Sequence, residues 1–136
     1  MANWYGSARS NYFQVRDAEA FLQWAERRSL GVFKSEQNAA IFAIHPGAST
    51  DSGGWPSFDM EEDKEFDLAA ELSEHLFPSQ VAVLLEVGAE KLRYLNGEAI
   101  AVNHSGRVIV LSLNDIYRKA AREFRVPENE ITRAEY

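Results

Sequence analysis

The apolar run Val81–Leu85 constrains the fold of this chain more than any other feature. Its sequence is Val-Ala-Val-Leu-Leu, and a continuous apolar run of this length is typical of a β-strand covered on both faces or lying at the centre of a sheet. Pro78 stands just before the run and ends any helix that precedes it. We therefore expect residues 81–85 to form a central strand and a main part of the hydrophobic core.

Patterns on either side of this run predict a mixture of strands and helices. Asp17 is placed to cap a helix whose apolar residues recur at helical spacing, and Gly31 suits the left-handed residue that follows a helix. Asn96-Gly97 and Ser105-Gly106 are turn dipeptides. The remaining predicted strands are 10–15, 32–35, 39–45, 98–103 and 107–111, and the remaining predicted helices start near 63 and near 113 and are stopped by Pro78 and Pro127.

The order of these elements predicts the fold class. Strand, helix, two strands, helix, and three strands with a final helix match an α+β plan. We expect a ferredoxin-like antiparallel sheet with helices packed on one face, extended by a β-hairpin and a C-terminal helix. A ferredoxin-like plan hosts many unrelated activities, so the fold alone does not indicate a function.

Length and composition indicate a single globular domain spanning residues 1–136. Hydrophobic residues make up 46% of the chain, which is enough to build a core. The absence of cysteine excludes disulfides, thiolate zinc sites and cysteine nucleophiles. No apolar run approaches the ~20 residues of a membrane span, and the first residues lack the pattern of a secretion signal. We expect a cytoplasmic protein with no membrane partner.

The segment 51–67 concentrates the negative charge of the chain. It holds seven of the 21 acidic residues and only one base, Lys64, so its net charge is -6, whereas the remaining 119 residues hold 14 acids and 13 bases. A local field of one sign attracts cationic partners and repels nucleic acid. The alternative interpretation is a solvated loop whose second half, from about Asp63, forms the first turn of a helix.

If this acidic loop binds a partner, two kinds of residue would make the contact. Trp55, held on a restricted Gly-Trp-Pro turn, and Phe58 would serve as apolar anchors, because aromatic residues dominate the energetics of protein interfaces. Carboxylates would face basic residues of the partner. The predicted partner-binding residues are Trp55, Phe58, Asp59, Glu61, Glu62, Asp63 and Glu65.

Metal and catalytic sites receive little support from the residue pattern. The acidic loop lacks the alternating ligands of a calcium loop, and the three histidines, His45, His75 and His104, lie in different elements without zinc spacing. No nucleophile elbow or phosphate-binding loop is present. We expect no cofactor, no metal and no catalysis. The open alternative is an enzyme or binding protein for small molecules such as nucleotides, with a pocket lined by Glu86, Arg93 and Tyr94.

The final predicted helix carries the one basic feature. Arg118, Arg122 and Arg125 lie on one side of it, opposite an apolar face that includes Ile116 and Tyr117. Such a stripe is most often a solvated helix face. It also suits contact between the basic stripe of one copy and the acidic loop of another, which would produce a homodimer, and self-association through the sheet is a further structural alternative.

Three short patches resemble a known group of proteins. Asn3–Phe13, the turn Gly53–Pro56 and Glu86–Leu95 look like small, largely uncharacterised proteins encoded by phages and mobile elements. The Asn-Trp opening loosely resembles ferredoxin-like proteins of the Api92 type, although those usually have cysteine where this chain has Tyr5. The resemblance implies an antagonist of host defence, of the anti-CRISPR or antirestriction type. We therefore expect a protein-binding inhibitor of a host defence system that acts on a host protein or complex with a basic surface.

Overall fold

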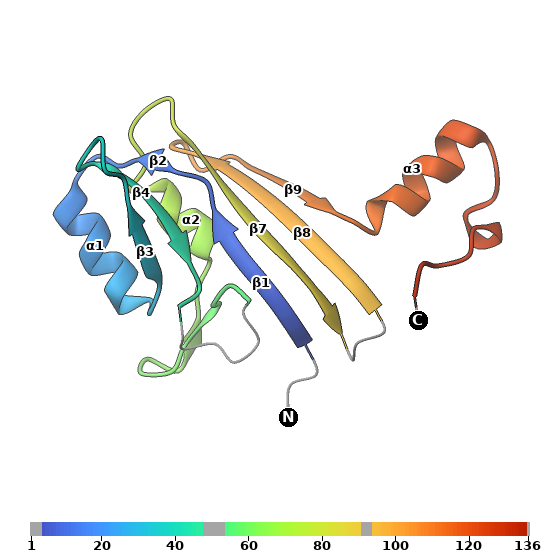
Figure 1. The fold of residues 1–136 in the computed structure, drawn as a ribbon, viewed down its shortest axis with the longest axis horizontal. Coiled ribbons are helices and arrows are strands. Elements are labelled where there is room, and N and C mark those ends of the chain that lie inside the picture. The colour runs from blue at the N-terminus through green and yellow to red at the C-terminus, as the bar shows by residue number, and fades with distance from the viewer. Residues whose placement is uncertain (1–3, 48–53, 91–93, 136) are drawn as a thin grey trace.

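The computed structural model describes residues 4–47, 54–90 and 94–135 and shows an α+β protein with mostly antiparallel sheets (Figure 1). The predicted mixed class is confirmed. The elements are the strands Trp4–Ser10 (β1), Phe13–Gln14 (β2), Gly31–Lys34 (β3), Ile41–His45 (β4), Phe58–Asp59 (β5), Lys64–Glu65 (β6), Val81–Glu90 (β7), Tyr94–Asn103 (β8) and Val108–Ser112 (β9), and the helices Ala18–Arg27 (α1), Leu68–Ser73 (α2), Asp115–Phe124 (α3) and Glu128–Glu130 (η1, a 3₁₀ helix).

The long strands form a four-stranded antiparallel sheet in the order β1-β7-β8-β9. The predicted central strand is confirmed, because β7 lies between β1 and β8. Its two faces differ, however. Ala82 and Leu84 are buried, whereas Val81, Leu85 and Val87 are exposed. Of the two alternatives for a continuous apolar run, the structure shows the central position and not cover on both faces, and the face that carries Leu85 lacks a covering layer within the described residues.

A smaller sheet in the order β2-β4-β3 continues from the end of β1. The hydroxyl of Ser10, the last residue of β1, accepts a hydrogen bond of 2.8 Å from the backbone N–H of Ile44 in β4, and this bond joins the two sheets. The predicted hairpin is confirmed as β3 and β4. The ferredoxin-like plan expected one sheet. The structure divides the strands among three, so that finer arrangement stays a prediction.

Helix α1 begins after Asp17, as predicted, and α2 begins after a second aspartate, Asp67, that was not predicted as a cap. The carboxylates of Asp17 and Asp67 each accept a hydrogen bond of 3.1 Å from the backbone N–H three residues later, which satisfies one of the free donors of a helix start. The left-handed residue after α1 is Ser29, with φ 58°, and not the expected Gly31, which begins β3. The helix that we expected from Asp63 begins at Leu68 instead.

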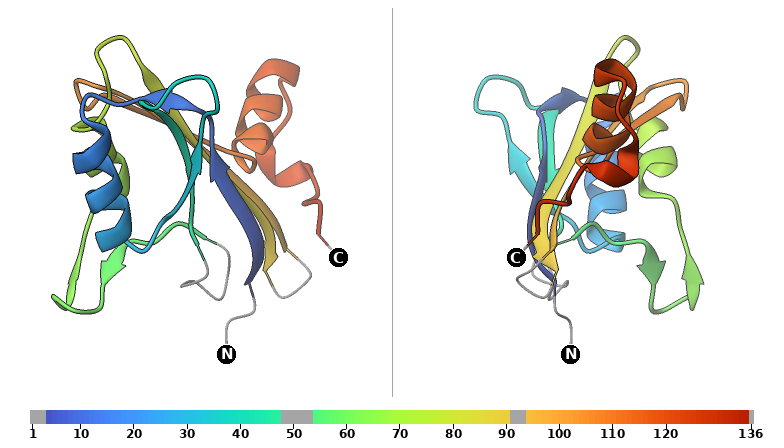
Figure 2. Two further views of the ribbon diagram at one scale, coloured as in Figure 1. Left: turned by 60° about the vertical axis from the view of Figure 1, so that its left-hand side comes forward. Right: turned by 90° about the vertical axis from the view of Figure 1, so that its right-hand side faces the viewer.

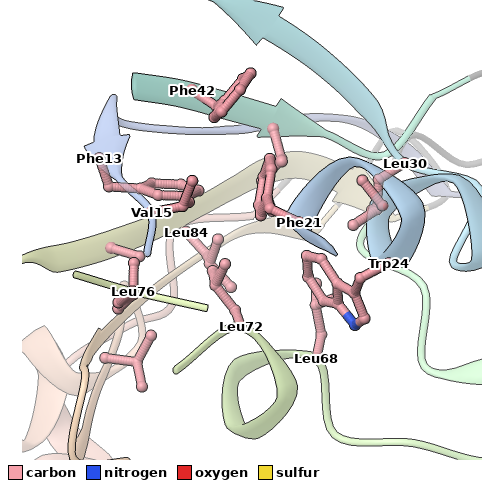
Figure 3. Packing of buried hydrophobic residues seen from close by; sticks show 14 of the residues in the cluster. Phe13, Val15, Phe21, Trp24, Leu30, Phe42, Leu68, Leu72, Leu76 and Leu84 are labelled. Carbon is pink, nitrogen blue, oxygen red and sulfur yellow. The ribbon is translucent and has the colours of Figure 1, made fainter. Parts of the chain in front are cut away.

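The hydrophobic core lies between the two larger sheets and the helices α1 and α2 (Figure 3). Phe21 of α1 stacks on Phe42 of β4 at a centroid distance of 5.0 Å and meets the edge of Phe13 at 5.8 Å. Leu72 of α2 and Leu84 of β7 close the opposite side. Fully buried side chains of this kind each contribute about 1.5–3 kcal/mol to folding, so this cluster accounts for much of the stability of the fold.

The C-terminal part stands apart from this core. Helix α3 packs chiefly against β9 and η1 and projects beyond the β8–β9 side of the large sheet (Figures 1 and 2). Its predicted helical spacing is confirmed, but none of its residues is buried, although its Ile116 and Phe124 belong to the apolar face that we expected to pack. The turn expected at Asn96-Gly97 is absent, because both residues lie within β8.

Candidate interaction site

The second half of the predicted acidic loop folds as a small hairpin. β5 and β6 pair antiparallel, with Phe58 opposite Glu65 and Asp59 opposite Lys64. One oxygen of the Asp59 carboxylate accepts hydrogen bonds from the backbone N–H groups of Glu61 and Glu62, at 2.9 and 3.1 Å, which fixes the turn. Asp63 adopts φ 53° in the left-handed region and turns the chain back. The acidic tip of the hairpin is thus ordered by its own first carboxylate.

Arg28 anchors this hairpin to the core through Asp59, the last residue of β5. Arg28 follows α1, and its side chain is only 9% exposed. Its guanidinium donates to Asp59 Oδ2 at 2.8 Å and, through two nitrogens, to the two oxygens of Glu71 at 2.8 and 2.7 Å. It also lies over the ring of Phe66, 4.0 Å from the ring centroid. One arginine therefore ties the hairpin to α2, since Glu71 belongs to that helix.

These contacts set the charge states of the groups involved. Backbone hydrogen bonds, first from Glu62, together with the charge of Arg28 lower the pKa of Asp59. The hydrogen bonds from Arg28, helped by the indole N–H of Trp24 at 2.8 Å, lower the pKa of Glu71. The same hydrogen bond with Glu71 raises the pKa of Arg28 further. All three groups stay ionised at neutral pH, so the anchor is a stable ion-pair network.

Trp55 holds in place the segment of chain that leads into the hairpin. Its backbone N–H donates to Glu86 Oε1 at 2.8 Å, and its indole N–H donates to the carbonyl of Leu85 at 3.3 Å. The ring is half-buried against the hydrophobic core. Trp55 therefore holds the chain against β7, and in this structure it packs inward and does not project as an anchor for a partner.

The outward-facing part of the site is the hairpin tip. Phe58 is 43% exposed and Met60 is 84% exposed. The carboxylates around them are exposed as well, and Lys64 pairs with Glu62 at 3.3 Å on the surface. Of the predicted binding residues, Glu61, Glu62 and Asp63 lie in the turn of the hairpin, whereas Phe58 and Glu65 lie opposite each other at its open end. Asp51, at the start of the predicted loop, lies outside the described residues.

Sequence reasoning missed Met60. It is one of two methionines in the chain and stands between Asp59 and Glu61, in the middle of a charged stretch. A long apolar side chain within a run of carboxylates is the signal that could have identified it, because a hairpin tip leaves such a side chain in solvent. Unbranched, polarisable methionine adapts readily to the shape of a binding partner.

The residues of the alternative enzymatic interpretation are placed differently. Glu86 lines a hollow of about 420 Å³ with Trp55, Asn96 and Ser112, and Glu98 lies directly opposite it on β8. The hydrogen bond from Trp55 already engages one oxygen of Glu86. Arg93 and the side chain of Tyr94 lie outside the described part of the chain. Glu86, Glu98 and Ser112 line this hollow together, so the alternative of a small-molecule site stays a prediction.

The histidines do not gather into a metal site. His75 packs against the ring of Trp24 at 5.1 Å, and burial lowers its pKa, which favours the neutral ring. His45 lies against Phe33 on the smaller sheet. Across residues 4–47, 54–90 and 94–135, no three His, Asp or Glu side chains come close enough to hold a metal ion.

Comparison of the chain with protein-family models, with curated proteins and with solved structures finds no match. Within the described ranges, no helix has the length and apolar character needed to cross a membrane.

Proposed function

We propose that this protein is a protein-binding module whose β5–β6 hairpin docks onto a basic surface of its partner. The observation that carries the proposal is the construction of the hairpin. Strand β5 is fixed at Asp59 by the Arg28 network, while Met60 in the turn and Phe58 at the start of β5 are exposed among carboxylates. An element that is already ordered loses little entropy on binding.

The charge and the apolar side chains have separate roles in this proposal. Carboxylates at the rim of an interface steer the approach of a cationic partner and fix its orientation. Met60 and Phe58 supply the desolvated centre from which most binding energy comes. Asp59 and Trp55 act within the chain, because they hold the hairpin in its shape. The same negative field repels nucleic acid, so a basic protein surface is the preferred partner.

The biological role that we propose is inhibition of a host defence system by protein–protein contact in the host cytoplasm. This step rests on the resemblance of three sequence patches to proteins of phages and mobile elements. A basic groove that normally holds nucleic acid, on a nuclease or a surveillance complex, is the kind of surface that the hairpin suits. The hairpin is short, so it would occupy part of such a groove and would not imitate a whole duplex.

Co-purification of the tagged protein with host nuclease and surveillance complexes tests this proposal. Changing Glu61, Glu62 and Glu65 to alanine should remove the partner, and Met60→Ser should weaken its capture, while the free protein keeps its circular dichroism spectrum. Capture of the intact protein should fall as salt rises. The control variant replaces Glu19, Glu26 and Glu36, three exposed carboxylates distant in sequence, and loses the same charge. Equal loss of capture in both variants would show that net charge matters and the hairpin does not.

A further inference from the structure

The C-terminal region exposes apolar side chains on a scale that the rest of the chain does not. All four apolar residues of β9 are exposed on both faces of the strand, with Ile109 at 65% and Leu111 at 61%. Leu113, Ile116 and Phe124 continue this surface into α3, and Phe124 is 75% exposed. The three positions, together with Ala120, follow the spacing of one helical stripe. The strand and helix thus carry a continuous apolar surface.

β9 is also an edge strand with free hydrogen-bonding groups. Hydrogen bonds from Leu113 N–H to the Gly97 carbonyl and from Asn103 N–H to the Arg107 carbonyl, at 2.9 and 3.2 Å, bracket its pairing with β8. Because bonded residues alternate along an antiparallel pair, Ile109 and Leu111 bond to β8, and the backbone groups of Val108 and Val110 point to the open edge. An apolar edge of this kind pairs readily with another strand.

Helix α3 leaves the sheet on the side of its uncovered face. Leu113 packs directly over Gly97, where an added Cβ would lie 2.7 Å from Leu113 Cδ1. Beyond this joint, a groove of about 650 Å³ separates the helix from the sheet, with Leu85, Val87 and Leu111 on the sheet side and Ile116 on the helix side. The helix therefore projects from the sheet without packing down onto it.

The accessible surface area of the chain is larger than that of a typical compact monomer of the same mass. A globular monomer of 15.4 kDa exposes about 7,200 Å². This chain exposes 9380 Å², an excess of about 2,200 Å² over that scaling. A standard interface removes about 800 Å² from each partner, and permanent homodimers remove more. An excess of this size is large enough to accommodate the area that an extensive dimer would bury.

Charge favours a second copy of this chain as that partner. Residues 115–125 contain four bases and two acids and so carry +2, and because the whole chain carries -7, the rest of it carries -9. The projecting helix is thus a cationic arm on an acidic body. Residues 51–67 carry -6 of this -9, so the opposite charges of arm and body favour the encounter of two copies, while the apolar side chains of β9 and α3 supply the contact itself.

We propose that two copies form a symmetric dimer in which their β9 edges pair antiparallel and each α3 lies on the uncovered sheet face of the other copy. A two-fold axis at β9 makes both contacts equivalent and leaves no open apolar edge. In an antiparallel pair, the end of one β9 lies beside the start of the other. Helix α3, which follows the end of β9, therefore lies over β8 and β9 of the second copy. This dimer is separate from the hairpin and goes beyond the proposed partner-binding role.

Sedimentation velocity of the full chain across a wide concentration range tests the dimer. We expect twice the chain mass of 15.4 kDa. Val110→Pro removes an N–H that points to the open edge and breaks no bond to β8, and Phe124→Asp charges the apolar stripe. Each should raise the dimer dissociation constant roughly 30-fold or more, the scale of a lost hot-spot contact, with an unchanged circular dichroism spectrum because neither residue is buried.

The matched control is Met60→Asp, which charges a still more exposed apolar residue on the hairpin and should leave the dimer intact. A monomeric wild-type chain at all concentrations would overturn the proposal, whether α3 then folds onto its own sheet or awaits a different protein. A dimer that survives Phe124→Asp overturns the exchange of α3, and a dimer that survives Val110→Pro overturns the pairing of β9. If the wild-type chain forms the dimer but captures no host nuclease or surveillance complex, that result would count against the hairpin proposal alone.

Discussion

At the scale of single residues, Arg28 is the group on which the candidate site depends. Its two carboxylate partners lie 31 and 43 residues further along the chain. Sequence reasoning identified Asp59 as an acid of the loop but could not pair it, because the attraction between charges depends on distance in space and the chain brings these groups together only when the core forms. Asp59 was predicted to face a partner, but in the structure its carboxylate faces Arg28 of the same chain.

Replacing Arg28 with methionine should destabilise the protein and loosen the hairpin. The change leaves the half-buried carboxylate of Glu71 without its charged hydrogen bonds, which we expect to cost roughly 1–2 kcal/mol of unfolding free energy once solvent screening is considered. Urea unfolding measures the effect. Arg27→Met, at the exposed neighbouring position, should change little. Arg28→Lys should restore only part of the loss, since lysine cannot bond both oxygens of Glu71 in the same planar way.

The pH dependence of stability should show the same network. The pKa values of Asp59 and Glu71 are lowered from their ordinary 3.8 and 4.5 by folding. A carboxyl of this kind stabilises the fold above its unfolded pKa and loses that contribution as the pH falls through its folded pKa. The contribution of these two carboxyls should therefore be constant between pH 7 and about 5.5 and fall below about 4.5. His75, whose pKa burial lowers from 6.5, adds a separate loss of unfolding free energy as the pH falls through that value, so the network is measured by comparison with Glu71→Gln. Glu71→Gln should flatten the fall, and an unchanged slope would show that the network is not coupled to folding.

At the scale of elements, local patterns predicted what depends on neighbours in sequence. The cap at Asp17, the hairpin of β3 and β4, and the helical spacing of α3 were all correct, because caps and spacing act over a few residues. The helix expected from Asp63 was wrong. Carboxylates there do suit a helix start, but Asp59 pairs with Arg28 and its carboxylate fixes a turn, so the chain folds into a hairpin before the helix begins at Leu68.

The cap of α2 gives a prediction at this scale. Asp67 is an acid of the predicted binding loop, yet its carboxylate caps a six-residue helix. Asp67→Ala should lower the unfolding free energy by about 1 kcal/mol and leave capture of the partner unchanged. Thermal unfolding and co-purification measure the two effects. Asp67→Ser, which can still cap the helix, should retain most of the stability, and a loss of binding with intact stability would instead place Asp67 at the interface.

At the scale of the whole molecule, the sequence indicated which strand lies in the core but not which face of that strand is left uncovered. Residues 81–85 are uniformly apolar, so their pattern cannot show which face the chain leaves open. The alternation between buried Leu84 and exposed Leu85 arises only because α1 and α2 occupy one side of the sheet. The charge of segment 51–67 follows from the sequence, while the hairpin of β5 and β6 and the exposure of Met60 are visible only in the structure.

The uncovered face leads to a prediction about folding of the entire protein. Association stabilises the folded state by mass action, so the thermal midpoint of a dimer rises with protein concentration, whereas that of a monomer does not. We expect the midpoint of the wild-type chain to rise over a hundredfold increase in concentration, and that of Phe124→Asp to stay constant. Scanning calorimetry at several concentrations measures both. Met60→Asp should behave as wild type, because its side chain lies on the hairpin, away from β9 and α3. If the wild-type midpoint does not move, the apolar surface of β9 and α3 is not buried by a second copy.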